Sequence, residues 1–163
     1  MRILLNGGGN GKKTIDANKI FNKIINHNKP LLYVPLALNS QKYSYENCLK
    51  WIIGEMNGIT DNIYMVNSFE ELKGQKFSDY SAIYIGGGNT YELLNGIKKY
   101  EIFDDISHFI NKNGIIYGGS AGAIIFGYSI NSIKMSDKND CNLNDCIGFN
   151  ILNREINCCT LYK

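Results

Sequence analysis

The chain contains no long apolar run and no leader-like segment at its first residues. Among its 163 residues, no uninterrupted apolar stretch reaches the roughly 18 residues that a membrane-spanning helix requires. Met1 leads directly into a short apolar run and then a glycine-rich segment, without the charged region and apolar core of a secretory signal. We therefore expect a cytoplasmic protein with no membrane partner.

Charge is nearly balanced, and the residue types that commonly bind metal ions are few. The formal net charge is only +2 and the lysines are scattered, so we expect no nucleic-acid partner. The chain has two histidines, His27 and His108, and five cysteines without a C-x-x-C pair. An odd number of cysteines in a cytoplasmic chain favours free thiols, and we expect neither a metal ion nor another cofactor.

Residues 6–14, NGGGNGKKT, raise nucleotide binding as an alternative. The phosphate-binding loop follows G-x-x-x-x-G-K-[ST]. Here Asn6 occupies the first glycine position and Lys13 occupies the hydroxyl position. The dinucleotide pattern G-x-G-x-x-G also fails, because Lys12 stands at its last glycine. These departures argue against a nucleotide site.

Short apolar runs alternate with amphipathic segments along the chain. Hydrophobic residues make up 44% and charged residues 20%, which is typical of one globular domain, here over residues 1–163. The periodicity predicts strands at 2–6, 30–37, 63–66, 80–88 and 114–118. It predicts helices at 14–27, 44–57, 68–73, 90–99 and 101–112, and a further helix at 121–128. Beyond these we expect weaker strands at 129–135 and 155–162, with a loop over 136–146.

Alternating helices and near-continuous apolar strands indicate a parallel sheet that is covered on both faces. We therefore predict an α/β fold, a three-layer α/β/α sandwich with a mostly parallel, doubly wound sheet. Ligands in such folds bind beyond the carboxyl ends of the strands. Three glycine-rich turns fall at those ends, at 7–9, 86–88 and 118–119.

The third turn continues into a serine. Residues 118–122 read GGSAG between a predicted strand and a predicted helix, which is the context of a nucleophile elbow. Small neighbours permit the tight turn, and the N–H of Ala121 would face a developing oxyanion. The alternative is a plain glycine turn in which Ser120 caps the next helix.

A second glycine turn, YIGGGNT over residues 84–90, ends the preceding strand. Its bare N–H groups could supply another oxyanion donor, or could only bind an anion. Asn89 and Thr90 could cap the following helix or contact substrate.

YIGGGNT followed by GGSAGA resembles the dipeptidase E family of serine peptidases, the aspartyl dipeptidases, whose relatives include cyanophycinase. The resemblance implies the class I glutamine amidotransferase-like fold with serine in place of cysteine at the elbow. It implies that Ser120 is the nucleophile and that Gly87, Gly88 and Ala121 lie around the oxyanion, with Asn89 beside the substrate. The implied reaction is hydrolysis of short peptides through a Ser120 ester.

The resemblance fails at the general base. The family carries a histidine in a stretch similar to I-N-P-H-F, where this chain reads INCCT over 156–160 and Cys159 takes the histidine position. We expect His27 at a solvated helix end and His108 inside a helix, so neither suits the role. A chain shortened at its C-terminus, or an inactive member that only binds peptides, stays open as an alternative, as does a homodimer that completes the site.

The acidic and basic residues that could serve an aspartyl dipeptidase are also few. Asp137 and Asp140 could orient a base or bind a substrate amine, but a solvated loop is the preferred interpretation. Arginine binds carboxylates best, and the chain has only Arg2 and Arg154. Aspartate specificity is therefore not predicted for this chain.

Overall fold

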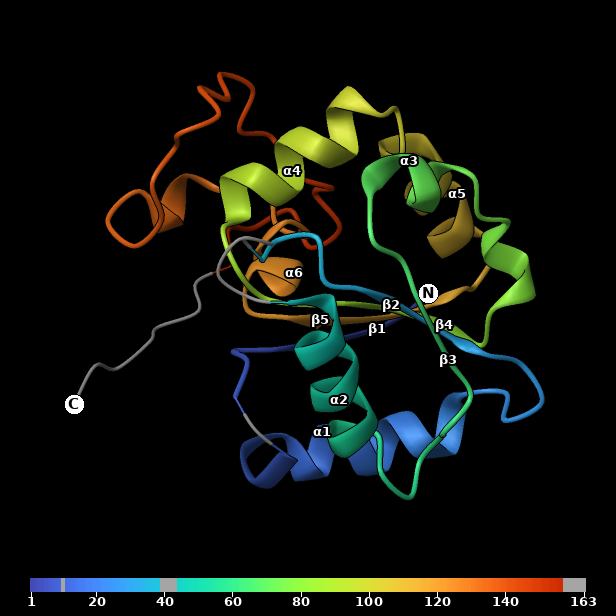
Figure 1. The fold of residues 1–163 in the computed structure, drawn as a ribbon. Helices are drawn as coiled ribbons and strands as arrows, with labels where there is room; N and C mark the ends of the chain where they lie inside the picture. Colours follow the sequence, from blue (N-terminus) through green and yellow to red (C-terminus); the bar gives the residue numbers. More distant parts are fainter. Residues whose placement is uncertain (10, 39–43, 157–163) are drawn as a thin grey trace.

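A five-stranded sheet forms the centre of the computed structural model, which describes residues 1–9, 11–38 and 44–156 (Figure 1). The strands lie in the order β1 (Arg2–Asn6), β5 (Ile115–Gly119), β4 (Ala82–Ile85), β2 (Leu31–Val34) and β3 (Ile63–Met65). Every pairing between neighbours is parallel. The predicted α/β fold with a parallel sheet is confirmed.

Helices cover both faces of this sheet (Figure 1). One face carries α1 (Gly11–Ile24) and α2 (Tyr45–Glu55). The other carries α3 (Phe69–Lys73), α4 (Thr90–Lys99), α5 (Phe103–Asn111) and α6 (Ala121–Ile124). The three layers are those expected from the alternation of strands and helices. Within the described ranges, none of the helices combines the length and apolar character needed to cross a bilayer.

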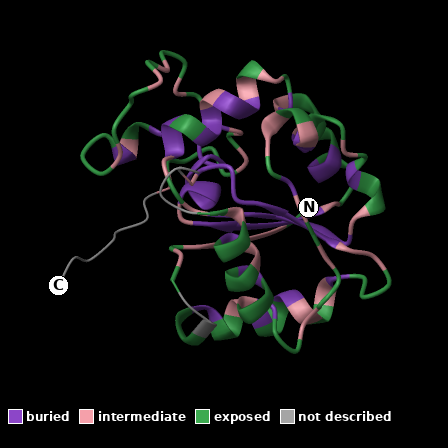
Figure 2. Cartoon of the chain, viewed as in Figure 1, coloured by how far each residue is buried: buried purple, intermediate pink, exposed green. Residues whose placement is uncertain are grey.

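The strands are buried along their whole length where they cross the middle of the sheet (Figure 2). Successive side chains of a strand point to opposite faces. In β2, Leu32 and Val34 accordingly pack with α3 to α6, whereas Leu31 and Tyr33 pack with α1 and α2. Because both faces are covered, the strands need apolar residues at every position, which explains their continuous runs in the sequence.

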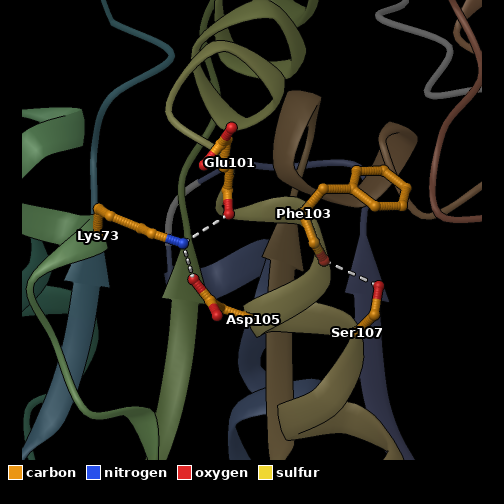
Figure 3. A network of polar contacts seen from close by, with 5 residues as sticks. All are labelled: Lys73, Glu101, Phe103, Asp105 and Ser107. Atoms are coloured by element: carbon orange, nitrogen blue, oxygen red, sulfur yellow. Dashed lines mark hydrogen bonds and ion pairs between the residues drawn. The ribbon is translucent and has the colours of Figure 1, made fainter.

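A polar contact ties three elements together on the α3–α5 side (Figure 3). The Nζ atom of Lys73, the last residue of α3, donates to the Asp105 carboxylate at 2.7 Å and to the Glu101 carbonyl at 2.8 Å. Glu101 has a φ of 56°, in the short turn between α4 and α5. Within α5, the Ser107 hydroxyl donates to the Phe103 carbonyl at 2.9 Å. Because both side chains are nearly half exposed to solvent, the ion pair contributes little stability by itself.

The expected strand at 129–135 is wrong. This segment contains the short 3₁₀ helix η2 (Asn131–Ile133), and its only ladder contact among the described residues is an isolated bridge between Ser129 and Ile147. Ile130 and Ile133 are both buried. Their spacing of three matches a tight helical turn and not the period of two of a strand.

Other boundaries also differ from the expectation. The first helix begins at Gly11 instead of residue 14, α6 has four residues, and the 3₁₀ helix η1 (Phe77–Asp79) was not predicted. The last expected strand, 155–162, is not formed at residues 155 and 156. Its remaining positions lie outside the described residues.

Candidate active site

Ser120 lies on a sharp turn between β5 and α6. Its φ of 51° and ψ of −115° are unusual for a residue with a side chain and cost energy that the surrounding structure must supply. The Ser120 N–H donates to the Asn6 carbonyl at 3.0 Å, while its own carbonyl accepts from Ala123 and Ile124 at the start of α6. The side chain does not cap this helix. The plain capping interpretation of Ser120 is therefore wrong, and the backbone has the form of an elbow.

Close approaches of the backbone explain the glycines around the elbow. A Cβ atom on Gly122 would lie 2.1 Å from the Ile85 carbonyl oxygen, and one on Gly118 would lie 2.4 Å from the Gly122 carbonyl oxygen. Either overlap would push α6 away from the sheet. The glycines of GGSAG are therefore needed because α6 packs very closely against β4 and β5.

The three glycine turns converge on the serine. A Cβ atom on Gly87 would lie 3.0 Å from the Ser120 Cβ atom, and one on Gly8 would lie 3.2 Å from it. Gly8 and Gly87 thus flank Ser120 on the two sides of β5, as expected for turns at one sheet edge. Ala121 follows as the first residue of α6. Of the predicted oxyanion donors, Gly87 and Ala121 are therefore close to Ser120, and their role stays a prediction.

Gly88 and Asn89 are held by structural contacts. Gly88 has a φ of 141°, and a Cβ atom there would lie 2.1 Å from the Ala37 carbonyl oxygen. Asn89 accepts from the Glu92 N–H at 3.1 Å and donates to the Lys138 carbonyl at 2.8 Å. Of the two roles considered for Asn89, the structure shows the helix cap; contact with substrate stays a prediction.

Asp137 lies in the expected loop, but its carboxylate is partly buried and not simply solvated. Its half-buried carboxylate accepts from the Thr90 N–H at 2.7 Å, at the first turn of α4. This position suits a negative charge, since the free N–H groups and the positive end of the helix dipole lie there. Asp140 is exposed, as predicted.

A cavity of about 440 Å³ opens beside Ser120 on the α1–α2 side of the sheet. We call it the elbow pocket. Ser120 and the glycine turns line part of it, through Gly8, Gly9, Gly87 and Gly119. The side chains that line it come from β2, β4, α2 and the segment after β2, namely Tyr33, Leu38, Asn47, Cys48, Trp51 and Tyr84.

Three aromatic rings form the wall of the elbow pocket. The Tyr33 and Tyr84 ring centroids are 5.6 Å apart, and the Trp51 centroid lies 6.2 Å from each of them. Burial raises the pKa of both tyrosines well above its ordinary value. Their hydroxyls therefore stay protonated and can form hydrogen bonds, but they do not act as bases near neutral pH.

Tyr117, on the neighbouring strand β5, packs beside this wall and makes a polar contact of its own. The Tyr117 ring packs 4.8 Å from the Tyr84 ring, and its hydroxyl donates to the buried Asn18 side chain at 2.5 Å. Burial also raises the pKa of Tyr117, to about 12. Within the described ranges, no group of three or more histidine, cysteine or acidic side chains is placed to hold a metal ion.

Comparison with known proteins identifies the family. A profile of Peptidase family S51 matches residues 3–158. The chain belongs to this family. S51 relatives with similar sequences include Peptidase E from a Nostoc species, 27% identical over 126 residues that cover 77% of this chain and 48% of the relative. Peptidase E from Shewanella denitrificans is 28% identical over 125 residues, with coverage of 77% and 50%. The chain spans about half the length of the curated S51 relatives it matches.

Solved structures support the fold. A Peptidase E candidate from Listeria monocytogenes superposes with a TM-score of 0.71 and 23% identity, over 93% of this chain and 75% of that one. A peptidase from an acI-B1 Actinobacterium gives a TM-score of 0.56 and 18% identity, over 91% and 64%. The S51 chain thus has the glutamine amidotransferase-like fold that the glycine motifs predicted.

Neither histidine of this S51 chain lines the elbow pocket among the described residues. His27 is exposed just beyond α1, where its ring contacts the Asn22 carbonyl at 3.0 Å. His108 is exposed in the last turn of α5. Because α5 leads into the amino end of β5, His108 lies toward the opposite sheet edge from Ser120. Cys159, at the position of the family histidine, lies outside the described residues.

The two arginines lie in different parts of the fold. Arg2 begins β1, at the amino edge of the sheet, and contacts the Asn113 carbonyl at 3.5 Å. Arg154 is exposed. Neither lines the elbow pocket in the described part of the chain.

The aromatic wall was missed from the sequence, although a signal for it exists. Tyr33, Tyr84 and Tyr117 each stand close to the end of a strand. The register pairs Tyr33 with Tyr84 and Tyr84 with Tyr117, so the three form a row across the sheet. The signal is a tyrosine one or two residues before the last residue of each of these three strands. Trp51, which comes from α2, carries no comparable signal.

Proposed function

We propose that this protein is a serine peptidase that acts on short peptides, with Ser120 as its nucleophile. The observation that carries the proposal is the backbone of Ser120, held at a φ of 51° between two glycine turns. Strain of this kind persists where the surrounding structure enforces it, often at catalytic sites. Membership of S51 supports the same chemistry.

In the proposed reaction, the Ser120 Oγ atom attacks the carbonyl carbon of the scissile peptide bond. A new C–O bond forms, the C–N bond breaks, and the serine proton passes through a base to the leaving amine. Water then hydrolyses the Ser120 ester and releases the acid. The N–H groups of Gly87, Gly88 and Ala121 are the proposed donors to the oxyanion that forms in each step.

The base is the unassigned part of this mechanism. Serine is a weak nucleophile near neutral pH and needs a proton acceptor. In the described residues, the titratable groups that line the elbow pocket are Cys48, Tyr33 and Tyr84, and burial raises the pKa of all three. Each therefore holds its proton more firmly than usual. The test of the proposal must work whether or not the isolated chain supplies its own base.

We would treat the purified chain with a fluorophosphonate probe and identify the labelled residue by peptide mass spectrometry. The Ser120→Ala variant is the control for the attachment site, and circular dichroism checks that it is folded. A parallel reaction contains added imidazole, which can accept the proton. Labelling of Ser120 that disappears in Ser120→Ala is expected. Absence of labelling both with and without imidazole, in a folded chain, would refute the proposal.

A further inference from the structure

We infer that the elbow pocket binds a large uncharged side chain of the substrate, preferably an aromatic one, and disfavours an acidic side chain. As a statement about substrate preference this rests on the proposed function, because it assigns the pocket to the residue whose carbonyl Ser120 attacks. As a statement about binding it stands on the elbow pocket alone.

The position of the elbow pocket fits a side-chain subsite. Ser120 and Gly87 both line it, so a peptide with its carbonyl at Ser120 would have the adjoining side chain beside this pocket. Its volume, about 440 Å³, is toward the lower end of the roughly 300–1,000 Å³ of small-molecule sites. That space suits one large side chain with its adjacent backbone atoms.

The lining of the elbow pocket is mainly apolar and aromatic. Tyr33, Tyr84 and Trp51 line it, and the Tyr33–Tyr84 and Trp51–Tyr84 ring pairs meet at 70° and 69°. Aromatic rings favour edge-to-face neighbours at such separations, so a substrate ring could extend the cluster. Trp51 is 39% exposed, which leaves part of its surface available to a ligand.

Charge explains the expected rejection of acidic side chains. No lysine or arginine lines the elbow pocket in the described residues. Lys13 comes near, but it packs its aliphatic carbons against Gly9 and is exposed to solvent. A carboxylate held by the described lining side chains alone would therefore lose hydration without gaining an ion pair, which is costly. The Tyr33 and Tyr84 hydroxyls could offer only neutral hydrogen bonds.

Trp51 allows a direct test, because it is the only tryptophan in the chain. In the Ser120→Ala protein, which cannot turn over substrate, we would titrate the dipeptides Phe-Gly, Asp-Gly and Gly-Gly and record tryptophan fluorescence. We expect Phe-Gly to alter the emission and to bind about tenfold or more tighter than Asp-Gly. Equal or tighter binding of Asp-Gly, or no binding of Phe-Gly, would overturn the inference.

Two substitutions on α2 test the wall itself. Trp51→Ala should weaken Phe-Gly binding about fivefold or more, measured by calorimetry. Ile53→Ala is the matched control, since Ile53 is an exposed apolar residue of the same helix outside the elbow pocket and should leave binding unchanged. Trp51→Arg should shift the preference toward Asp-Gly by adding a cation. Unchanged Phe-Gly affinity in Trp51→Ala would contradict the assignment of the pocket.

The two proposals fail separately. If Phe-Gly binds as expected but fluorophosphonate never labels Ser120, the peptidase proposal is wrong and the pocket assignment stands. If Ser120 is labelled but Asp-Gly binds better than Phe-Gly, the peptidase proposal stands and the inferred preference is wrong.

Discussion

The strained backbone of Ser120 predicts that the protein is more stable without a side chain at this position. Ser120→Gly should unfold at a higher denaturant concentration than Ser120→Ala. Both variants lack the hydroxyl, so any hydrogen bond that it makes is lost equally from both. They differ only in the Cβ atom, which alanine retains at a φ of 51° and glycine does not.

The expected difference follows from two opposing contributions. A residue with a Cβ atom in this region of backbone conformation costs roughly 1–3 kcal/mol, which glycine avoids. Glycine lowers the free energy of unfolding by about 0.5–1 kcal/mol relative to alanine, because the unfolded chain has more conformational freedom at a glycine. Ser120→Gly should therefore be more stable than Ser120→Ala by roughly 0–2.5 kcal/mol, with a mid-range value of about 1 kcal/mol. In a protein of this size, that corresponds to several degrees in Tm.

Urea unfolding followed by far-UV circular dichroism measures this difference. Ser107 supplies the matched control, because it lies inside α5, where the backbone is helical. There the order should reverse, with Ser107→Gly about 1 kcal/mol less stable than Ser107→Ala. If Ser120→Gly were equal to or less stable than Ser120→Ala, the elbow would not be strained, and the observation that carries the proposed function would be lost.

Three further predictions concern the surroundings of the elbow. Gly122→Ala should lower the free energy of unfolding in urea by about 2–3 kcal/mol, because its Cβ atom would overlap the Ile85 carbonyl. Gly54→Ala, in open space on α2, should raise it by up to about 1 kcal/mol. Similar values for both would contradict the packing described. The pKa of Tyr117 is about 12 in the folded protein, above the ordinary value near 10. The contribution of Tyr117 to stability should therefore be complete below pH 10 and be lost as the pH rises through 12. Phenolate absorbance that titrates entirely near pH 10 in the folded protein would exclude this. Asp137→Ala should destabilise the protein by about 1 kcal/mol through α4, with exposed Asp140→Ala as a neutral control, and equal effects would show that the contact with Thr90 is unimportant.

The sequence predicted the layers and the serine turn because each depends on local patterns. Apolar runs placed the five strands, three of which lead into glycine turns, and GGSAG placed Ser120 after one of them. Parallel strands end at one edge, so the convergence of the glycine turns followed from the fold. Helix caps such as Asn89 were also recognisable, since they involve neighbours in sequence.

Contacts between distant segments could not be predicted in this way. Asp137 caps α4 across 47 residues, and nothing in the composition of its loop distinguishes it from Asp140. The elbow pocket depends on α2 placing Trp51 against Tyr33 and Tyr84, which is a matter of helix orientation on the sheet. The strand expected at 129–135 was wrong because its two isoleucines are three residues apart. That spacing suits a 3₁₀ turn and does not suit a strand.

The pairing of β1 with β5 has a consequence for the order of folding. Arg2 pairs with Ile115, and the N–H of Ser120 bonds to the Asn6 carbonyl, so the serine turn is anchored to a segment more than a hundred residues earlier. Closing so large a loop costs entropy, and contacts between distant residues form slowly. The helices and the β2–β4 pairing can form before this step. During refolding, the turn at Ser120 should therefore form after helical structure, and a partly folded chain would lack this turn.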